Sequence, residues 1–167
     1  MASIRVRPAR AGDEAALAEL HQREWGGPVV VVHNTRYDLR VLHTLVAVDD
    51  TGAVAGALTY RVDADGLEVV SLAASAPGNG TGSALMTAAE EVAGAVGADR
   101  IWLVTTNDNL GALRFYQRRG LRIVGVDAGA VDRARAVKPT IPHVGADGIP
   151  LHDELRLARI LPAESRR

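Results

Sequence analysis

The segment 77–82 reads Pro-Gly-Asn-Gly-Thr-Gly and separates an apolar stretch, 67–74, from a stretch with helical spacing of apolar residues, 83–96. The first stretch is typical of a strand, and the second of a helix that buries one side. Three glycines at alternate positions leave backbone N–H groups uncovered at the N-terminus of this helix. Such a terminus binds anions, most often phosphate, through N–H contacts and the helix dipole.

A second motif lies downstream, where residues 109–116 read Asn-Leu-Gly-Ala-Leu-Arg-Phe-Tyr and predict another helix. On a helix that begins near Asn109, the residues Asn109, Ala112 and Tyr116 are three and four positions apart and share one face. The small side chain of Ala112 lets a ligand approach closely, and Tyr116 presents a phenol one turn further on. The alternative interpretation is that Tyr116 and the neighbouring Phe115 only pack in the core.

Composition and charge indicate one ordinary globular domain. The chain has 167 residues, 47% hydrophobic and 23% charged, which suits one domain and is short for two. Its net charge of −1 provides no general positive field, so no nucleic-acid partner is expected. The absence of cysteine excludes disulfides and thiolate catalysis, and no histidine pair has metal-ligand helical spacing, so no metal is expected. No leader or membrane span is evident, which predicts a cytoplasmic protein without a membrane partner.

The rest of the chain predicts a single α+β domain over 1–167, with a frayed end at 161–167. The segment 29–32 reads as a short strand, 34–42 as a loop or a helical turn, and 141–150 as a Gly/Pro loop. The other predicted strands are 3–7, 45–48, 54–62, 67–74, 100–105, 121–126 and 151–160, and the predicted helices are 13–25, 83–96, 110–119 and 128–137.

Two familiar nucleotide-binding loops do not fit the glycine segment. A dinucleotide fingerprint needs glycine or alanine where Ser83 stands, and it needs an early βαβ unit in place of the predicted hairpins. A Walker A loop needs a lysine after its last glycine, and none is present. A glycine-rich turn that only starts a helix remains the alternative for this segment taken alone.

Taken together, the two motifs resemble the GNAT acyltransferases, the acetyl-CoA-dependent N-acetyltransferase superfamily. The resemblance extends along nearly the whole chain and follows that family's order of elements. It implies a GNAT fold, with a mixed, mostly antiparallel sheet of about seven strands whose two central parallel strands splay apart. The residues that carry it are Gly78, Gly80, Gly82, Asn109, Ala112, Phe115, Tyr116 and Gly120.

One residue departs from the family pattern. Pro77 stands where the family loop commonly has a basic or amide side chain. A side-chain contact to phosphate is thereby lost, whereas the backbone donors of the three glycines remain. The resemblance therefore implies binding of the pyrophosphate by backbone alone.

The resemblance implies acetyl transfer from acetyl-CoA to a primary amine by direct attack, in a ternary complex. Tyr116 matches the family's general acid, and Glu68, a carboxylate within an apolar strand, is the preferred base, with a solvent-edge acid as its alternative. The CoA-binding positions are Leu72, Ala74, Gly78, Asn79, Gly80, Thr81, Gly82, Ser83, Asn109, Ala112 and Tyr116.

The resemblance also implies that the first helix–loop region and the segment before the last strand line the site of the acceptor, a small-molecule or peptide amine. The segment 137–150 is either a lid over the amine or a contact with a second subunit, and a homodimer is left open. Two other functions stay open: a catalytically weak or inactive CoA-binding module, and a structural domain whose glycine turn binds nothing. The candidate acceptor residues are Glu24, Trp25, Tyr37 and His143, with His33, His152, Asp153 and Glu154 as further candidates.

Overall fold

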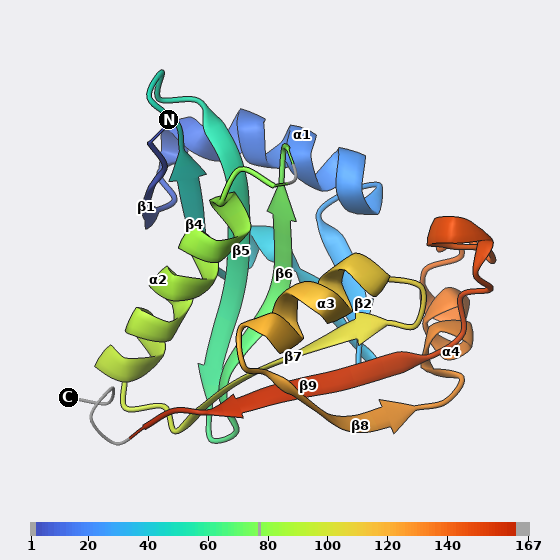
Figure 1. Cartoon of the computed structure of the whole chain (residues 1–167). Coiled ribbons are helices and arrows are strands. Elements are labelled where there is room, and N and C mark those ends of the chain that lie inside the picture. The colour runs from blue at the N-terminus through green and yellow to red at the C-terminus, as the bar shows by residue number, and fades with distance from the viewer. Residues whose placement is uncertain (1–2, 77, 163–167) are drawn as a thin grey trace.

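The computed structural model describes residues 3–76 and 78–162 and has a mixed seven-stranded sheet with helices on both faces (Figure 1). The helices are α1 (Glu14–Trp25), α2 (Thr81–Ala95), α3 (Leu110–Arg118) and α4 (Ala130–Val137). The strands are β1 (Arg5–Pro8), β2 (Val29–Val32), β3 (Thr35–Asp38), β4 (His43–Val48), β5 (Val54–Asp63), β6 (Gly66–Ala74), β7 (Arg100–Thr106), β8 (Arg122–Asp127) and β9 (Glu154–Ile160).

The strands of the large sheet follow the order β1-β4-β5-β6-β7-β9-β8, and β2 pairs with β3 in a separate hairpin. Every neighbouring pair in the large sheet is antiparallel except β6 and β7, which are parallel. The right-handed crossover expected between parallel strands is made through α2, which begins directly after the glycine segment. The predicted α+β class and the seven mixed strands are confirmed.

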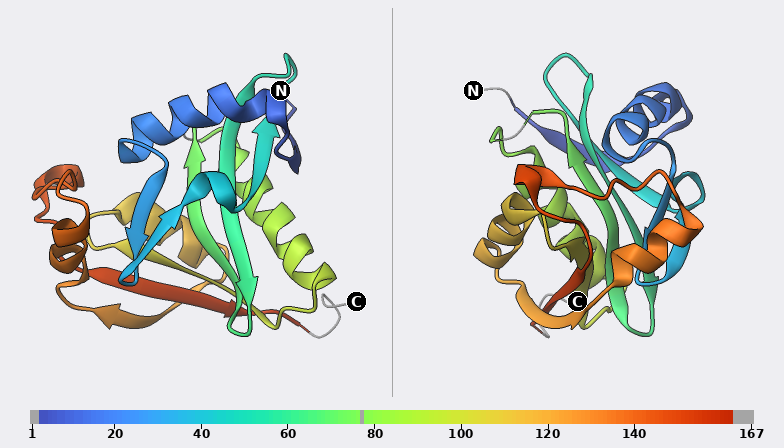
Figure 2. Two further views of the ribbon diagram at one scale, coloured as in Figure 1. Left: turned by 180° about the vertical axis from the view of Figure 1, so that it is seen from behind. Right: turned by 90° about the vertical axis from the view of Figure 1, so that its right-hand side faces the viewer.

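The core lies on both faces of this sheet. On one face, α2 and α3 cover the largest apolar cluster, which includes Leu58, Leu85, Met86, Ile101 and Leu157. On the other face, α1 and the β2–β3 hairpin cover two smaller clusters (Figure 2). Most residues of β6 and β7 are therefore buried.

Two predicted segments differ from the structure. Residues 34–42, predicted as a loop or a helical turn, contain β3 and a 3-10 turn at Leu39–Val41. His33 and Asn34 form the turn of the β2–β3 hairpin with φ of +39° and +62°. The last strand begins at Glu154, later than predicted, because residues 151–153 bind the loops beside them.

Candidate active site

Strands β6 and β7 pair over only a short distance, from Leu67 opposite Ile101 to Val69 opposite Leu103. Beyond that point β6 continues to pair with β5, and β7 continues to pair with β9. The facing edges of β6 and β7 therefore separate, and their main-chain groups there are available to a ligand. The predicted splay of two central parallel strands is confirmed.

A cavity of about 490 Å³ lies in this opening. Its size is within the range of about 300–1,000 Å³ that is common for small-molecule sites. The separating strands and α3 form its inner part, with residues 69–72, 103–106, Asn109 and Tyr116. The end of α1, β2, α4 and the following loop form its outer part, with residues 24–26, 30–32, Val131, Ala134, Lys138, 140–142, Leu151 and Glu154.

The glycine segment starts α2 without a side-chain cap. Gly78 and Gly80 have φ of +80° and +82°, a conformation that side chains other than glycine rarely adopt. Gly80 is the N-cap and provides no side chain, while Asn79 Oδ1 accepts a hydrogen bond from Thr81 N at 3.1 Å. The first turn of α2 carries no acidic side chain. This N-terminus therefore suits an anion, although Pro77 lies outside the described residues and its predicted effect stays a prediction.

Close packing fixes the start of α2. A Cβ atom on Gly56 of β5 would lie 2.7 Å from Thr81 Cγ2, and one on Gly82 would lie 3.4 Å from the ring of Phe115 in α3. Thr81 is fully buried, and Ser83 follows in the same turn. The glycine segment is therefore held between β5 and α3, and it follows β6, whose residues 69–72 line the cavity.

Tyr116 lies on α3 and lines the inner part of the cavity with only 8% of its surface exposed. Burial raises the pKa of the Tyr116 phenol, so it stays protonated near neutral pH. Asn109 also lines the cavity, and its Oδ1 caps α3 by accepting a hydrogen bond from Ala112 N at 3.3 Å. Leu72 lines the cavity as well, whereas Ala74 at the end of β6 and Ala112 do not. Ala112 packs against the main core.

Glu68 is 1% exposed and does not line the cavity. Its Oε2 lies 2.6 Å from His33 Nε2, and its Oε1 accepts hydrogen bonds from the Tyr37 hydroxyl at 3.2 Å and from Arg61 Nη1 at 3.3 Å. We call these four residues the Glu68 network. Glu68, predicted as the base, is therefore surrounded by three side-chain partners outside the cavity lining. Tyr37, predicted as an acceptor residue, is one of these partners.

Glu154 is the buried carboxylate that does line the cavity. It is 4% exposed, and its Oε1 accepts a hydrogen bond from His33 N at 3.0 Å. Burial raises the pKa of Glu154, and the His33 bond opposes this only in part. A carboxyl group with a raised pKa in a cleft is a typical proton acceptor, so the geometry makes Glu154 a candidate base.

The other predicted acceptor residues divide into two groups. Glu24 and Trp25 line the outer part of the cavity, whereas His143 is exposed and does not line it. The backbone N–H groups of His152 and Asp153 both donate to Asn107 Oδ1 at 3.0 Å, so these residues hold the start of β9 in place.

The segment after α4 closes one side of the cavity. Residues 140–142 line it, and further along the segment Ala146 N donates a hydrogen bond at 2.9 Å to Asp108, which lies between β7 and α3. Lys138, Val131 and Ala134 were not predicted as site residues. The apolar spacing of Ala130, Val131 and Ala134 is the sequence signal that this helix packs on another part of the protein, and all three residues are buried in the structure.

The part of the chain that the structure describes holds no cluster of three or more histidine, cysteine, aspartate or glutamate side chains suited to a metal ion. Nor is any helix within residues 3–76 and 78–162 long and apolar enough to cross a membrane.

Comparison with known proteins identifies the family to which this chain belongs. Residues 13–121 match the family model described as Acetyltransferase (GNAT) family. Among curated relatives from Bacillus subtilis (strain 168), the uncharacterized protein YxbD is 37% identical over 140 residues, 84% of this chain and 88% of that protein. The uncharacterized protein YdhI is 34% identical over 145 residues, 87% of this chain and 91% of that protein.

A solved structure has a similar fold. An acetyltransferase of Bacillus subtilis in complex with CoA superimposes with a TM-score of 0.71 at 22% sequence identity, covering 96% of this chain and 100% of that one. The family model spans more than half of this chain, and both curated relatives exceed 30% identity over more than four-fifths of it. The chain therefore belongs to the GNAT acetyltransferase family.

Proposed function

We propose that this protein is an N-acetyltransferase that moves an acetyl group from acetyl-CoA to a primary amine by direct attack. The observation that carries the proposal is the cavity between β6 and β7, which has a phenol, Tyr116, at its inner part and a buried carboxylate, Glu154, at its outer part. These are the two proton-transfer groups that aminolysis of a thioester requires.

The residues present fit CoA. The uncapped N-terminus of α2, with Gly78, Asn79, Gly80, Thr81, Gly82 and Ser83, would hold the pyrophosphate through backbone N–H groups. The free edge of β6 near Leu72 and Ala74 would pair with the amide-bearing arm, and Asn109 and Ala112 would border it from α3. The thioester would supply the acetyl group at the inner end of the cavity.

In this proposal Glu154 is the base. A primary amine arrives mainly as an ammonium ion, and Glu154 takes one proton from it so that the nitrogen lone pair becomes available. The C–N bond then forms as the C–S bond breaks, and the second nitrogen proton leaves to solvent. Glu68 fits this role less well, because its carboxylate is enclosed by the Glu68 network and does not line the cavity.

Tyr116 is the proposed acid, donating its proton to the departing sulfur. Its hydroxyl makes no hydrogen bond to another side chain or to backbone within the described residues, which leaves it free for a ligand. A phenol is protonated near neutral pH, and the raised pKa of Tyr116 keeps it so, which means that the proton is present when sulfur leaves. Glu24 and Trp25 would contact the acceptor at the outer part of the cavity.

Two measurements test the proposal in sequence. Acetyl-CoA should raise the thermal midpoint of unfolding, since a ligand that binds only the folded state stabilises it. A panel of primary amines is then screened for CoA release. Glu154→Gln should lower kcat/KM by about 10²- to 10⁴-fold, and Tyr116→Phe by about 10²-fold, as removal of a general base or acid does.

The matched control is Tyr60→Phe, because Tyr60 stacks on His43 and lies outside the cavity. It should leave turnover unchanged. Absence of any stabilisation by millimolar acetyl-CoA would reject the proposal entirely. Stabilisation without acetylation of any amine would leave a CoA-binding module in its place.

A further inference from the structure

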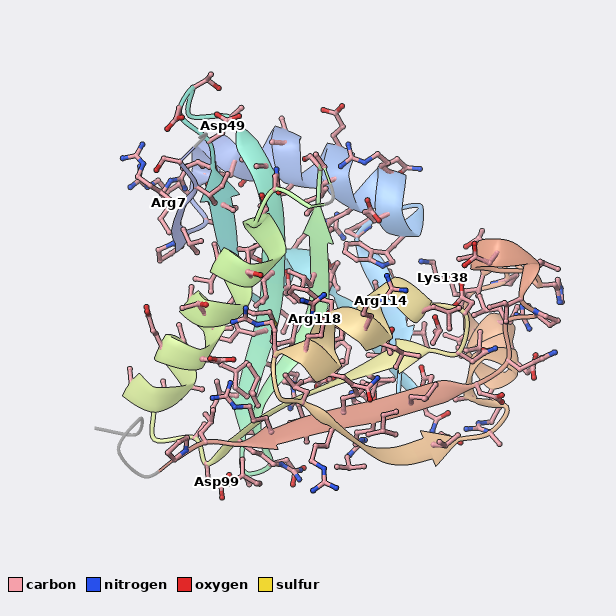
Figure 3. All side chains as sticks on the ribbon, viewed as in Figure 1. Arg7, Asp49, Asp99, Arg114, Arg118 and Lys138 are labelled. Carbon is pink, nitrogen blue, oxygen red and sulfur yellow. The ribbon has the colours of Figure 1, made fainter. Side chains whose placement is uncertain are left out.

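Lys138 is a cation at the cavity without an anionic partner. It follows the last residue of α4 and is the only lysine of the chain (Figure 3). Its Nζ donates to the carbonyl oxygens of Trp25 and Val29, at 2.7 Å each. No carboxylate of the described residues forms an ion pair with it.

The two carbonyl partners explain only part of this arrangement. The two hydrogen bonds connect the end of α4 to the end of α1 and to the start of β2. They use two of the three N–H groups of the Lys138 ammonium. Lys138 is half-buried and lines the cavity, and its burial lowers its pKa. A partly buried cation without a counter-charge is unfavourable, and an anionic group of a ligand would relieve this.

The surroundings of Lys138 indicate the kind of anion. The outer cavity is otherwise mostly apolar, with Val30, Val131, Ala134, Ile141 and Leu151 on its walls. A single ammonium with one remaining N–H suits a carboxylate better than a phosphate, which requires several donors. The apolar walls suit an aliphatic body.

Two carboxylates, Glu24 and Glu154, also line the cavity, and Glu154 is the buried one. Lys138 Nζ donates to Val29 O at the start of β2, and Glu154 accepts from His33 N just after the end of that strand. Residues 30–32 separate these two contacts, which is about 10 Å at about 3.3 Å per residue of strand. The Lys138 ammonium and the Glu154 carboxylate therefore contact points on β2 that are about as far apart as the two ends of a small zwitterion with its hydrogen bonds.

We propose that the acceptor is a small aliphatic amino carboxylic acid, with its amine at Glu154 and its carboxylate at Lys138. This rests on the proposed N-acetyltransferase function and specifies its substrate class.

Two matched sets of amines test the substrate class. Leucine is compared with leucinamide and 3-methylbutylamine, and 5-aminopentanoate with 5-aminopentanamide and pentylamine. Wild-type enzyme should prefer the carboxylate of at least one set by about 10- to 100-fold in kcat/KM, the range of a hydrogen bond to a charged group. Lys138→Gln, whose amide can still donate two hydrogen bonds, should lose this preference mainly through KM, and Lys138→Arg should retain part of it.

A binding measurement separates this inference from catalysis. Because the chain has one lysine, ¹³Cε-lysine labelling gives a single side-chain signal, which should shift when leucine or 5-aminopentanoate is added in the presence of CoA. The control Arg122→Gln removes an exposed cation on β8 that does not line the cavity, and it should behave as wild type.

The outcomes distinguish the two proposals. Amine acetylation without any carboxylate preference, and no shift of the Lys138 signal, would overturn the substrate class and leave the acetyltransferase function. A shift of the Lys138 signal that the carboxamides do not cause, without acetylation of any amine, would support the carboxylate site and reject the acetyltransferase function. An equal carboxylate preference in Lys138→Gln and wild type would also overturn the assignment to Lys138.

Discussion

Replacing Glu68 tests whether the buried carboxylate of β6 is structural or catalytic. Its two oxygens contact His33, Tyr37 and Arg61 at 2.6 to 3.3 Å, and its side chain is almost fully enclosed. Glu68→Leu keeps a side chain of similar volume but removes every acceptor at this point. Glu68→Gln keeps the shape and the acceptor oxygen nearest Tyr37.

The contacts set the size of the effect. Removing one partner of a buried charged pair costs about 3–5 kcal/mol. Each partner of Glu68 keeps a second contact: Arg61 with Asp63 at 2.7 Å, and His33 and Tyr37 with each other at 3.3 Å. Arg61 is also partly solvated. We therefore expect the lower end, about 3 kcal/mol for Glu68→Leu, and about 1 kcal/mol for Glu68→Gln.

Urea unfolding followed by circular dichroism measures the decrease in the free energy of unfolding. The thermal midpoint should fall by about 6–12 °C for Glu68→Leu in a protein of this size. Turnover of Glu68→Gln should stay within about tenfold of wild type, since Glu68 does not line the cavity. Unchanged stability of Glu68→Leu would refute the energetic argument. A fall of more than about 10²-fold in the turnover of Glu68→Gln, with stability retained, would make Glu68 the base and remove Glu154 from that role.

Two further predictions concern Glu154 and Gly66, the first residue of β6. Burial raises the pKa of Glu154, so ionising this carboxyl group costs free energy in the folded state. The free energy of unfolding is therefore highest below the ordinary glutamate pKa, where the group is protonated, and it falls as pH rises through the raised pKa. Glu154→Gln should therefore unfold at a higher temperature than wild type at pH 8, with the difference vanishing below about pH 4, and a constant difference across pH would contradict this. Gly66→Ala should lower the free energy of unfolding by more than about 2 kcal/mol, because Gly66 has φ of +107° and a Cβ there would overlap the carbonyl of Arg100. The control is Gly52→Ala, because Gly52 has φ of +84° but open space around it, and it should lower the free energy of urea unfolding by about 1 kcal/mol. Equal losses in the two variants would exclude the contact with Arg100 as the cause.

The order of elements could be predicted because it depends on local patterns. The apolar runs of β4 and β5 on either side of a turn, the helical spacing in α2 and the glycine after α3 each reflect neighbours in the chain. The β2–β3 hairpin was missed for a local reason: its turn is His33-Asn34, whereas the usual signal for a two-residue turn is Asn-Gly or Asp-Gly. Asn34 tolerates a positive φ, and the Thr-Arg-Tyr of β3 favours a strand, so a weaker signal was present.

The candidate site was harder to predict than the fold. Along β9, Glu154 and Arg156 alternate with Leu155 and Leu157, and this pattern predicts one core face and one solvent face. The leucine face does pack in the main core. The other face is covered at Glu154 by the hairpin turn at His33, which is 121 residues away in the chain. Burial of Glu154 therefore depends on a long-range contact that periodicity does not contain.

His33 gives the two carboxylates their different environments. Its ring contacts Glu68, and its backbone N–H binds Glu154, so one turn residue meets both acids in different ways. The positive φ of His33 and Asn34 reverses the chain within two residues and brings this N–H to β9 while the ring reaches β6. Glu68 thereby gains a second side-chain partner in Tyr37 and is closed off, whereas Glu154 receives only one backbone donor from the turn and stays open to the cavity. Glu154 has one backbone donor, a pKa raised by burial and access to the cavity, so the hairpin, more than the strand sequence, decides which carboxylate can meet a substrate amine.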